Sequence, residues 1–102
     1  MVIGRVHCRP ERRDDLVALL TEMQDNSRGE AGCLSYGFFA AVENSLSFVA
    51  VEEWADRQAL DRHFAQAHLQ EFARRLPQVV SSQPEVAIHE VAESRPFPRE
   101  VG

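Results

Sequence analysis

The chain opens on a stretch in which apolar and polar side chains alternate. Residues 2–8 read VIGRVHC, where Arg5 and His7 alternate with apolar side chains. A period of two predicts a β-strand that buries one of its faces. Pro10 ends this strand and suits the first turn of a following helix, where the missing N–H of a proline costs nothing.

Residues 14–27 change to a helical period. Their apolar members recur at intervals of three and four: Leu16, Leu19, Leu20 and Met23. This spacing predicts an amphipathic helix that lies with one face on an apolar surface. Gly29 and Gly32 mark the end of the helix and the turn that follows it.

Two further strands are predicted over residues 33–42 and 46–54. The first is rich in aromatic residues, and a short polar turn over residues 43–45 separates it from the second. Two strands joined by so short a turn form an antiparallel hairpin.

The helical period returns at Asp56, an acidic N-cap, and continues to about Leu76. The apolar residues Phe64 and Leu69 stand five positions apart, whereas a continuous stripe steps by three or four. A straight helix would turn part of this stripe towards solvent. We therefore expect a kink or a break near residues 66–67.

Pro84 opens a last predicted strand over residues 86–91, and residues 94–102 are expected to form a tail or an exchanged arm. The order of elements is then β-α-β-β-α-β. It predicts an α+β, ferredoxin-like fold, with an antiparallel sheet that carries both helices on one face. A chain of 102 residues suits a single domain, here residues 1–93, followed by the tail.

The two middle strands are apolar on both faces, and the helices can cover only one of these. In the strand over residues 33–42, Leu34, Tyr36 and Phe38 share one face while Phe39 lies on the other. A second copy, packed sheet against sheet in a closed two-fold pair, would cover the remaining face. We therefore expect a homodimer; the alternative is that these aromatic side chains stay exposed.

Composition narrows the possible functions. The net charge is -5, and all eleven basic residues are arginines without the basic stripe that nucleic-acid-binding domains usually carry. No apolar run approaches the roughly 18 residues of a membrane span, and no signal peptide is recognisable, so we expect a cytoplasmic protein. Cys8 and Cys33 lack metal-type spacing, and reduced, buried thiols are expected; a reactive redox pair is the alternative.

Histidines are the candidate proton carriers. An unperturbed histidine titrates near neutral pH, as a general base should. His63 precedes the apolar Phe64, so we expect it at the rim of a pocket. The alternative is a half-exposed histidine bonded to a carboxylate. His68 either lines the same pocket or orients the helix break. The two histidines stand five positions apart, whereas metal-binding pairs on one helix face stand four apart, so no metal site is expected.

The pocket itself is expected between the sheet and the helices. The side chains predicted to bind a small aromatic substrate are Tyr36, Phe39, Trp54, Phe64, His68 and Phe72. The alternative is that the aromatic residues among them only fill the core. Glu52 and Glu53 lie on opposite faces of a strand, so one of them can point inwards. A buried glutamate needs a partner, for which Arg5 and Arg57 are the candidates.

Four short blocks occur in a recognisable order. They are RPER at residues 9–12, EAGCLSY at residues 30–36, FVAVEEW at residues 48–54, and ALDRHF at residues 59–64 followed by His68. Together they resemble the antibiotic biosynthesis monooxygenase-like family. The resemblance covers about residues 2–93.

This resemblance implies a dimeric α+β barrel. It also implies an oxygenase that converts phenols or hydroquinones to quinones with O₂, without metal or flavin. Some members degrade haem through an Asn, a Trp and an axial His, but the corresponding positions here hold Gly4, His63 and Ala73. We therefore expect a cofactor-independent monooxygenase acting on a quinol or polyphenol. A non-catalytic module that binds a small aromatic ligand on the same barrel is the alternative.

Overall fold

The computed structural model describes residues 1–98 of the chain. Its strands are β1 (Val2–His7), β2 (Cys33–Ala40), β3 (Ser47–Trp54) and β4 (Glu85–Ile88). Its helices are α1 (Arg13–Arg28), α2 (Arg57–Phe64) and α3 (Ala67–Arg75), with short 3-10 turns at η1 (Pro10–Arg12) and η2 (Leu76–Gln78). This order confirms the predicted α+β, ferredoxin-like fold.

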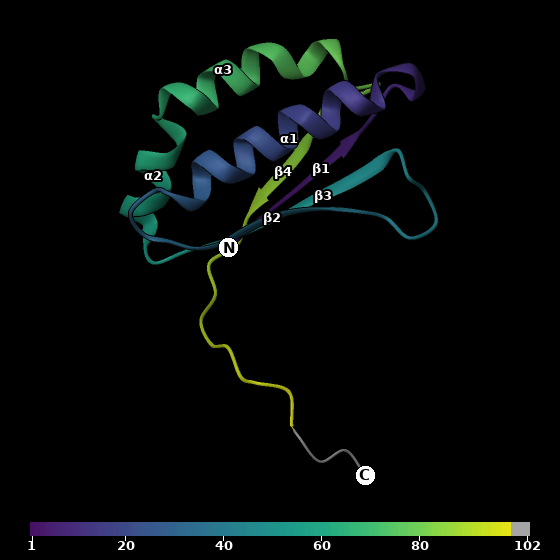
Figure 1. Ribbon diagram of the computed structural model, residues 1–102. Coiled ribbons are helices and arrows are strands. Elements are labelled where there is room, and N and C mark those ends of the chain that lie inside the picture. The colour runs from purple at the N-terminus through teal and green to yellow at the C-terminus, as the bar shows by residue number, and fades with distance from the viewer. Residues whose placement is uncertain (99–102) are drawn as a thin grey trace.

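The strands form one antiparallel sheet in the order β2-β3-β1-β4. Val2 on β1 pairs with Glu52 on β3 and with Ile88 on β4, so β1 lies inside the sheet. The three α-helices lie over one face of the sheet and leave the opposite face bare (Figure 1).

α1 forms where the helical period predicts it and extends one residue further at each end. Asp14 and Asp15 lie in its first turn and Arg28 in its last, which suits the helix dipole at both ends. Its apolar stripe is buried: Leu16, Leu19, Leu20 and Met23. This stripe packs on the covered face of the sheet and forms a large part of the hydrophobic core.

The predicted break in the second helical stretch is confirmed. α2 ends at Phe64 and α3 begins at Ala67. Between them the backbone of Gln66 is extended, with φ -67° and ψ 142°. α3 therefore starts afresh, and the direction in which His68 points is set by the break and not by the turns of α2.

One strand departs from the predicted alternation. The pairing of β2 with β3 shifts register between Cys33 and Ser35. This bulge leaves Leu34 67% exposed, although the alternation places it on the same face as Tyr36. A bulge inserts one extra residue into a strand, and a simple period of two does not reveal it.

The chain beyond β4 leaves the body of the domain. β4 covers Glu85–Ile88 and is shorter than the predicted strand over residues 86–91. The segment that follows runs away from the sheet (Figure 1), and residues 94–98 are exposed. The remainder of the predicted tail, residues 99–102, lies outside the described residues.

The bare face of the sheet carries an apolar patch. Ile3, Val49 and Val51 are half-buried on it, and Phe39 is 57% exposed. Within residues 1–98 the chain places no second layer over this face (Figure 1). An exposed apolar surface of this kind is typical of a contact surface. In the same part of the chain, no helix is long and apolar enough to cross a bilayer.

Candidate active site

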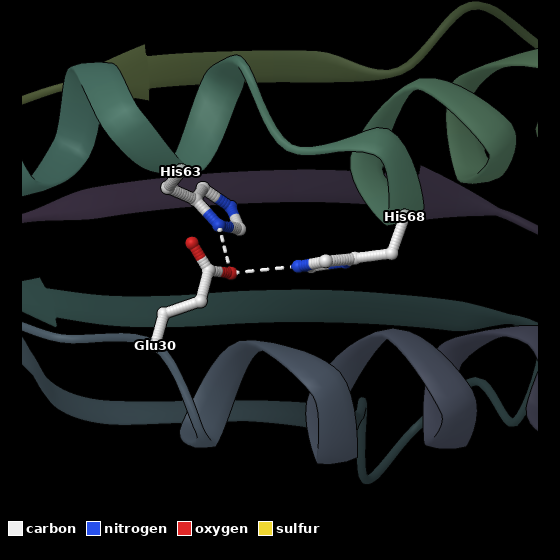
Figure 2. Close-up of side chains that lie close together, drawn as sticks. All are labelled: Glu30, His63 and His68. Carbon is white, nitrogen blue, oxygen red and sulfur yellow. Dashed lines mark hydrogen bonds and ion pairs between the residues drawn. The ribbon is translucent and has the colours of Figure 1, made fainter.

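Three side chains from separate segments meet beside the helix break. Glu30 lies in the turn between α1 and β2, His63 in the last turn of α2, and His68 in the first turn of α3. The Nδ1 atom of His63 and the Nε2 atom of His68 each lie 2.8 Å from Oε2 of Glu30. Figure 2 shows the carboxylate held by both imidazoles. One oxygen therefore accepts both hydrogen bonds.

The break is what brings the two histidines together. On a continuous helix, residues five apart point in clearly different directions, because neighbours on one face stand three or four apart. The extended backbone at Gln66 redirects the chain before His68. The argument that the five-residue spacing keeps His63 and His68 from converging is therefore wrong.

Gly32 allows the turn that carries Glu30 to approach α2 closely. Its φ is +84°, in the left-handed region that side chains rarely adopt. A Cβ atom at this position would lie 2.5 Å from the Cβ of Ala59 on α2. Only glycine fits both the backbone angle and the contact, and this close contact sets the carboxylate of Glu30 within reach of His63.

The second ring nitrogen of His63 faces another carboxyl group. Its Nε2 lies 3.7 Å from Oε1 of Glu52, and the same oxygen accepts a hydrogen bond of 3.1 Å from the indole N–H of Trp54. The inward-pointing glutamate is thus Glu52, and Glu53 is exposed. His63 lies between Glu30 on one side and Glu52 on the other.

The prediction that Arg5 or Arg57 pairs with the buried glutamate is wrong. Arg57 pairs instead with Asp61 on the surface of α2, at 3.0 Å. Arg5 is exposed, since the buried neighbours Gly4 and Val6 face the helices and strand alternation turns Arg5 to the other side. Trp54, two positions from Glu52 and so on its own face of β3, provides the hydrogen bond.

Burial governs the protonation of this cluster. It raises the pKa of Glu52 to about 7, because desolvation disfavours the carboxylate and outweighs the hydrogen bond from Trp54. Burial also lowers the pKa of His63, although the hydrogen bond to Glu30 opposes this change. An ionised Glu30 can only accept, so a neutral His63 donates from Nδ1 and directs its Nε2 lone pair towards Glu52.

Aromatic rings hold the imidazole of His63 in place. Its centroid lies 4.5 Å from that of Trp54 and 5.7 Å from that of Tyr36. The Tyr36 ring meets it edge-on, with an interplanar angle of 62°. Burial raises the pKa of the Tyr36 phenol, so this side chain stays protonated near neutral pH. The imidazole therefore has little freedom to tilt.

A cavity of about 210 Å³ opens between the sheet and the helices α2 and α3. Its walls are mostly apolar, and Phe38, Phe64 and Phe72 contribute aromatic rings. Small residues leave the space on both sides: Gly4 and Ala50 on the sheet and Ala73 on α3. Its polar lining includes Glu52, His63 and Tyr36. An apolar pocket with a few polar groups that converge is the usual form of a small-molecule site.

The structure brings together only some of the predicted site residues. Tyr36, His63, Phe64 and Phe72 line this cavity. Trp54 supports Glu52 from outside it, and His68 contacts Glu30 beyond its wall. Phe39 lies on the bare face of the sheet, because it follows the inward-facing Phe38 by one position.

His63 is not at a rim. It is 1% exposed, so the expected rim position and the half-exposure of the alternative are wrong, whereas the bond to a carboxylate in that alternative is confirmed by Glu30. The period of a helix predicts which face a residue occupies, but not what covers that face. Here the turn that carries Glu30 covers the face of α2 on which His63 lies. Sequence reasoning missed Glu30 altogether. The one signal in the sequence is Gly32, two positions after Glu30 and just before β2, because a glycine marks a turn that can approach another element closely.

The two cysteines stand apart from the site. Cys8 is buried and Cys33 is half-buried, and both are free thiols as expected. Burial raises the pKa of each thiol, which makes it a weaker nucleophile at neutral pH.

The sequence profile of the antibiotic biosynthesis monooxygenase family matches residues 1–75. The chain belongs to this family. Among its relatives, sll1783 of Synechocystis, an uncharacterized protein, is 32% identical over 95 residues, which are 93% of this chain and 65% of that protein. YcnE of Bacillus subtilis, whose name marks it as a candidate monooxygenase, is 28% identical over 86% of this chain and 93% of its own length.

Solved structures agree with this family membership. Rv0793 of Mycobacterium tuberculosis superposes with a TM-score of 0.83 at 28% identity, over 92% of this chain and 96% of its own. A family member from Deinococcus radiodurans reaches a TM-score of 0.88 over 96% of this chain and 99% of its own. At 24% identity this second match shows the fold alone.

Proposed function

We propose that this antibiotic biosynthesis monooxygenase-family protein is a cofactor-independent monooxygenase that oxidises a small quinol or polyphenol with O₂. One observation carries the proposal: a buried imidazole, His63, lies between two carboxyl groups on the wall of an apolar cavity. Such a cavity accepts an aromatic ring, and such an imidazole accepts a phenolic proton.

The chemistry begins with proton loss. A phenol is a poor electron donor to O₂, whereas its anion is a good one. The substrate supplies all four electrons: one oxygen atom enters the ring and the other leaves as water, so that a hydroquinone becomes a hydroxyquinone. His63 takes the proton at Nε2, and the hydrogen bond from Nδ1 to Glu30 then stabilises the imidazolium. Glu30 thus has the role that a buried carboxylate has behind a catalytic histidine in other enzymes.

The cavity performs the other half of the task. The rings of Phe38, Phe64 and Phe72 pack on the substrate ring and keep bulk water away from the anion. Glu52, with a pKa of about 7, is partly protonated at neutral pH and donates a hydrogen bond to a developing oxyanion. The family's named relatives support an oxygenase, while the quinol or polyphenol is our own assignment.

We also propose that the working form is a homodimer. The bare face of the sheet carries Ile3, Phe39, Val49 and Val51, which one chain leaves in contact with water. Two such faces packed together form a dimeric α+β barrel, in which the sheet of each copy covers the apolar face of the other. The partners are thus a second copy, a small aromatic substrate and O₂.

The test is oxygen uptake by metal-free protein across a panel of hydroquinones and catechols. We expect turnover by the wild type and a loss of about 10²-fold in His63→Gln, the usual size of a general-base contribution. His89→Gln is the matched control, since His89 lies after β4 and away from this cavity. Full activity in His63→Gln would contradict the proposal. Ligand binding without oxygen uptake would favour a binding module.

A further inference from the structure

We propose that Glu30, His63 and His68 form a binding site for a divalent transition-metal ion such as Zn²⁺, which holds His63 in a form that cannot accept a proton. The ligand atoms are a carboxylate oxygen of Glu30, Nδ1 of His63 and Nε2 of His68. These atoms all lie within 4.8 Å of one another. The second half of the proposal, the effect on proton transfer, rests on the proposed function.

The geometry is close to that of a loaded site. Both imidazole nitrogens lie 2.8 Å from the same oxygen of Glu30, as Figure 2 shows. Zn²⁺ binds nitrogen and oxygen ligands at about 2.0–2.2 Å, so neighbouring ligand atoms around it stand roughly 3 Å apart. Binding of the ion would require the two nitrogens to move towards each other and the carboxylate to turn, until all three ligand atoms lie at this distance from it.

The donor set selects the class of ion. Two imidazoles and one carboxylate suit Zn²⁺ and its first-row neighbours, whereas Mg²⁺ and Ca²⁺ prefer oxygen ligands alone. Three protein ligands leave at least one position open for water. The site can be reached from solvent, since the side chains of Glu30 and His68, which do not line the cavity, are 10% and 20% exposed.

The surroundings of His63 match those of a metal ligand. A ligating histidine usually donates its second ring N–H to a carboxylate, which fixes the direction of the ring. Nε2 of His63 faces Oε1 of Glu52 at 3.7 Å, and Trp54 holds that oxygen with a hydrogen bond. The ring itself is packed between Trp54 and Tyr36.

The competing explanation is a hydrogen-bonded clasp across the helix break, with no ion. The two readings differ in what His68 must supply. A clasp needs only a hydrogen-bond donor to Glu30, which the side-chain amide of a glutamine can also provide. A metal site needs the imidazole nitrogen itself, so His68→Gln distinguishes the two readings.

Binding would change what His63 can do. An ion on Nδ1 occupies the lone pair of that nitrogen and displaces the hydrogen bond to Glu30. The single ring proton must then sit on Nε2, the atom that faces Glu52 and the cavity. In this form the imidazole has no free lone pair, so it cannot take a proton from a phenol. Zn²⁺ is therefore expected to inhibit the oxygenase.

The experiment is calorimetric titration of the tag-free, chelator-treated dimer with Zn²⁺, and with Co²⁺ as a spectroscopic probe. We expect one ion per chain at micromolar affinity or better, together with visible absorption bands from bound Co²⁺. His68→Gln and Glu30→Gln should each weaken binding by at least about tenfold, as loss of a supporting group alone already does. His89→Gln is the control for adventitious binding near the N-terminal amine, which bonds to the His89 carbonyl.

The possible results test the metal site, the proposed function and the inhibitory role separately. Binding that is weaker than micromolar in the wild type, or unchanged in a folded His68→Gln, would overturn the metal site. The readout needs no turnover, so a protein that binds Zn²⁺ but oxidises no quinol keeps the site and removes the proposed function. Oxygen uptake that continues at saturating Zn²⁺ would overturn the inhibitory role.

Discussion

The Nδ1 atom of His63 lies 2.8 Å from Oε2 of Glu30, although the two residues stand 33 positions apart in the chain. The contact joins the last turn of α2 to the loop before β2. It fixes which nitrogen of the imidazole carries the proton and which faces the cavity. This relationship underlies both the proposed proton transfer and the proposed metal site.

Replacing Glu30 should therefore impair activity more than binding. Glu30→Gln keeps the size of the side chain but no longer stabilises a positive imidazolium. We expect kcat to fall by about 10²-fold with a small change in KM, and the free energy of unfolding to fall by about 1–3 kcal/mol. Steady-state oxygen uptake measures kcat and KM, and thermal melting measures the loss of stability. Glu71→Gln, an exposed glutamate on α3, is the matched control, and an equal loss in it would contradict the prediction.

Filling the cavity should abolish substrate binding without unfolding the protein. A Cβ atom at Gly4 would lie 3.6 Å from Val86 and 3.7 Å from Ala50, which is ordinary contact. Gly4→Val therefore projects a branched side chain into the cavity from a strand that tolerates it. We expect quinol turnover to be lost while the melting temperature stays or rises. Gly29→Ala, outside the cavity, should retain activity. Normal turnover in Gly4→Val would show that the chemistry lies elsewhere.

Glu52 should make stability depend on pH in a defined direction. Its pKa is raised from 4.5 to about 7 in the folded protein, so the folded chain holds a proton that the unfolded chain has lost. This contribution to stability is present in full below pH 4.5, decreases as the pH rises through about 7, and then levels off. Its full size is at most about 3 kcal/mol.

Glu52→Gln isolates that contribution. The pKa of His63 is lowered, which acts in the opposite sense, but this effect is common to both proteins and largely cancels in their difference. The stability of Glu52→Gln relative to the wild type should increase between pH 4.5 and 7, as chemical denaturation at a series of pH values would show. A difference that does not change with pH would mean that Glu52 titrates normally.

A charge on the bare face of the sheet should separate the dimer. Val51 lies opposite Ile3 in the pairing of β3 with β1, within the apolar part of this face. Val51→Glu places a carboxylate there opposite an apolar side chain, so we expect light scattering to report a monomer where the wild type is a dimer. Moderate salt should leave the wild-type dimer intact, because apolar contacts are little screened. Val42→Glu, in the exposed hairpin turn, is the control.

Much of the fold could be predicted from the spacing of apolar residues alone. The slip between Phe64 and Leu69 predicted the helix break, because a period is a local property of the sequence. The bulge at Cys33 and Ser35 was missed, since one inserted residue imitates ordinary alternation. Its consequence is that Leu34 points outwards.

The site was harder to predict, because it depends on contacts between distant segments. Tyr36, His63, Phe64 and Phe72 were found, as their types and faces suggest a pocket. Glu30 was missed, because no local period relates a loop residue to a helix that follows 27 positions later at Arg57. The convergence of His63 and His68 also depends on the direction that the chain takes after the helix break. The spacing of apolar residues predicts that the helix breaks, but not the direction in which α3 then runs.

The cavity beside His63 is proposed to oxygenate a phenolic ring without a cofactor. The most direct test is mass spectrometry of the product formed from a hydroquinone by chelator-treated protein under isotopically labelled O₂. We expect a product that carries a labelled oxygen atom, formed by the wild type and not by His63→Gln. A product that lacks the label, or equal labelling by the two proteins, would contradict it.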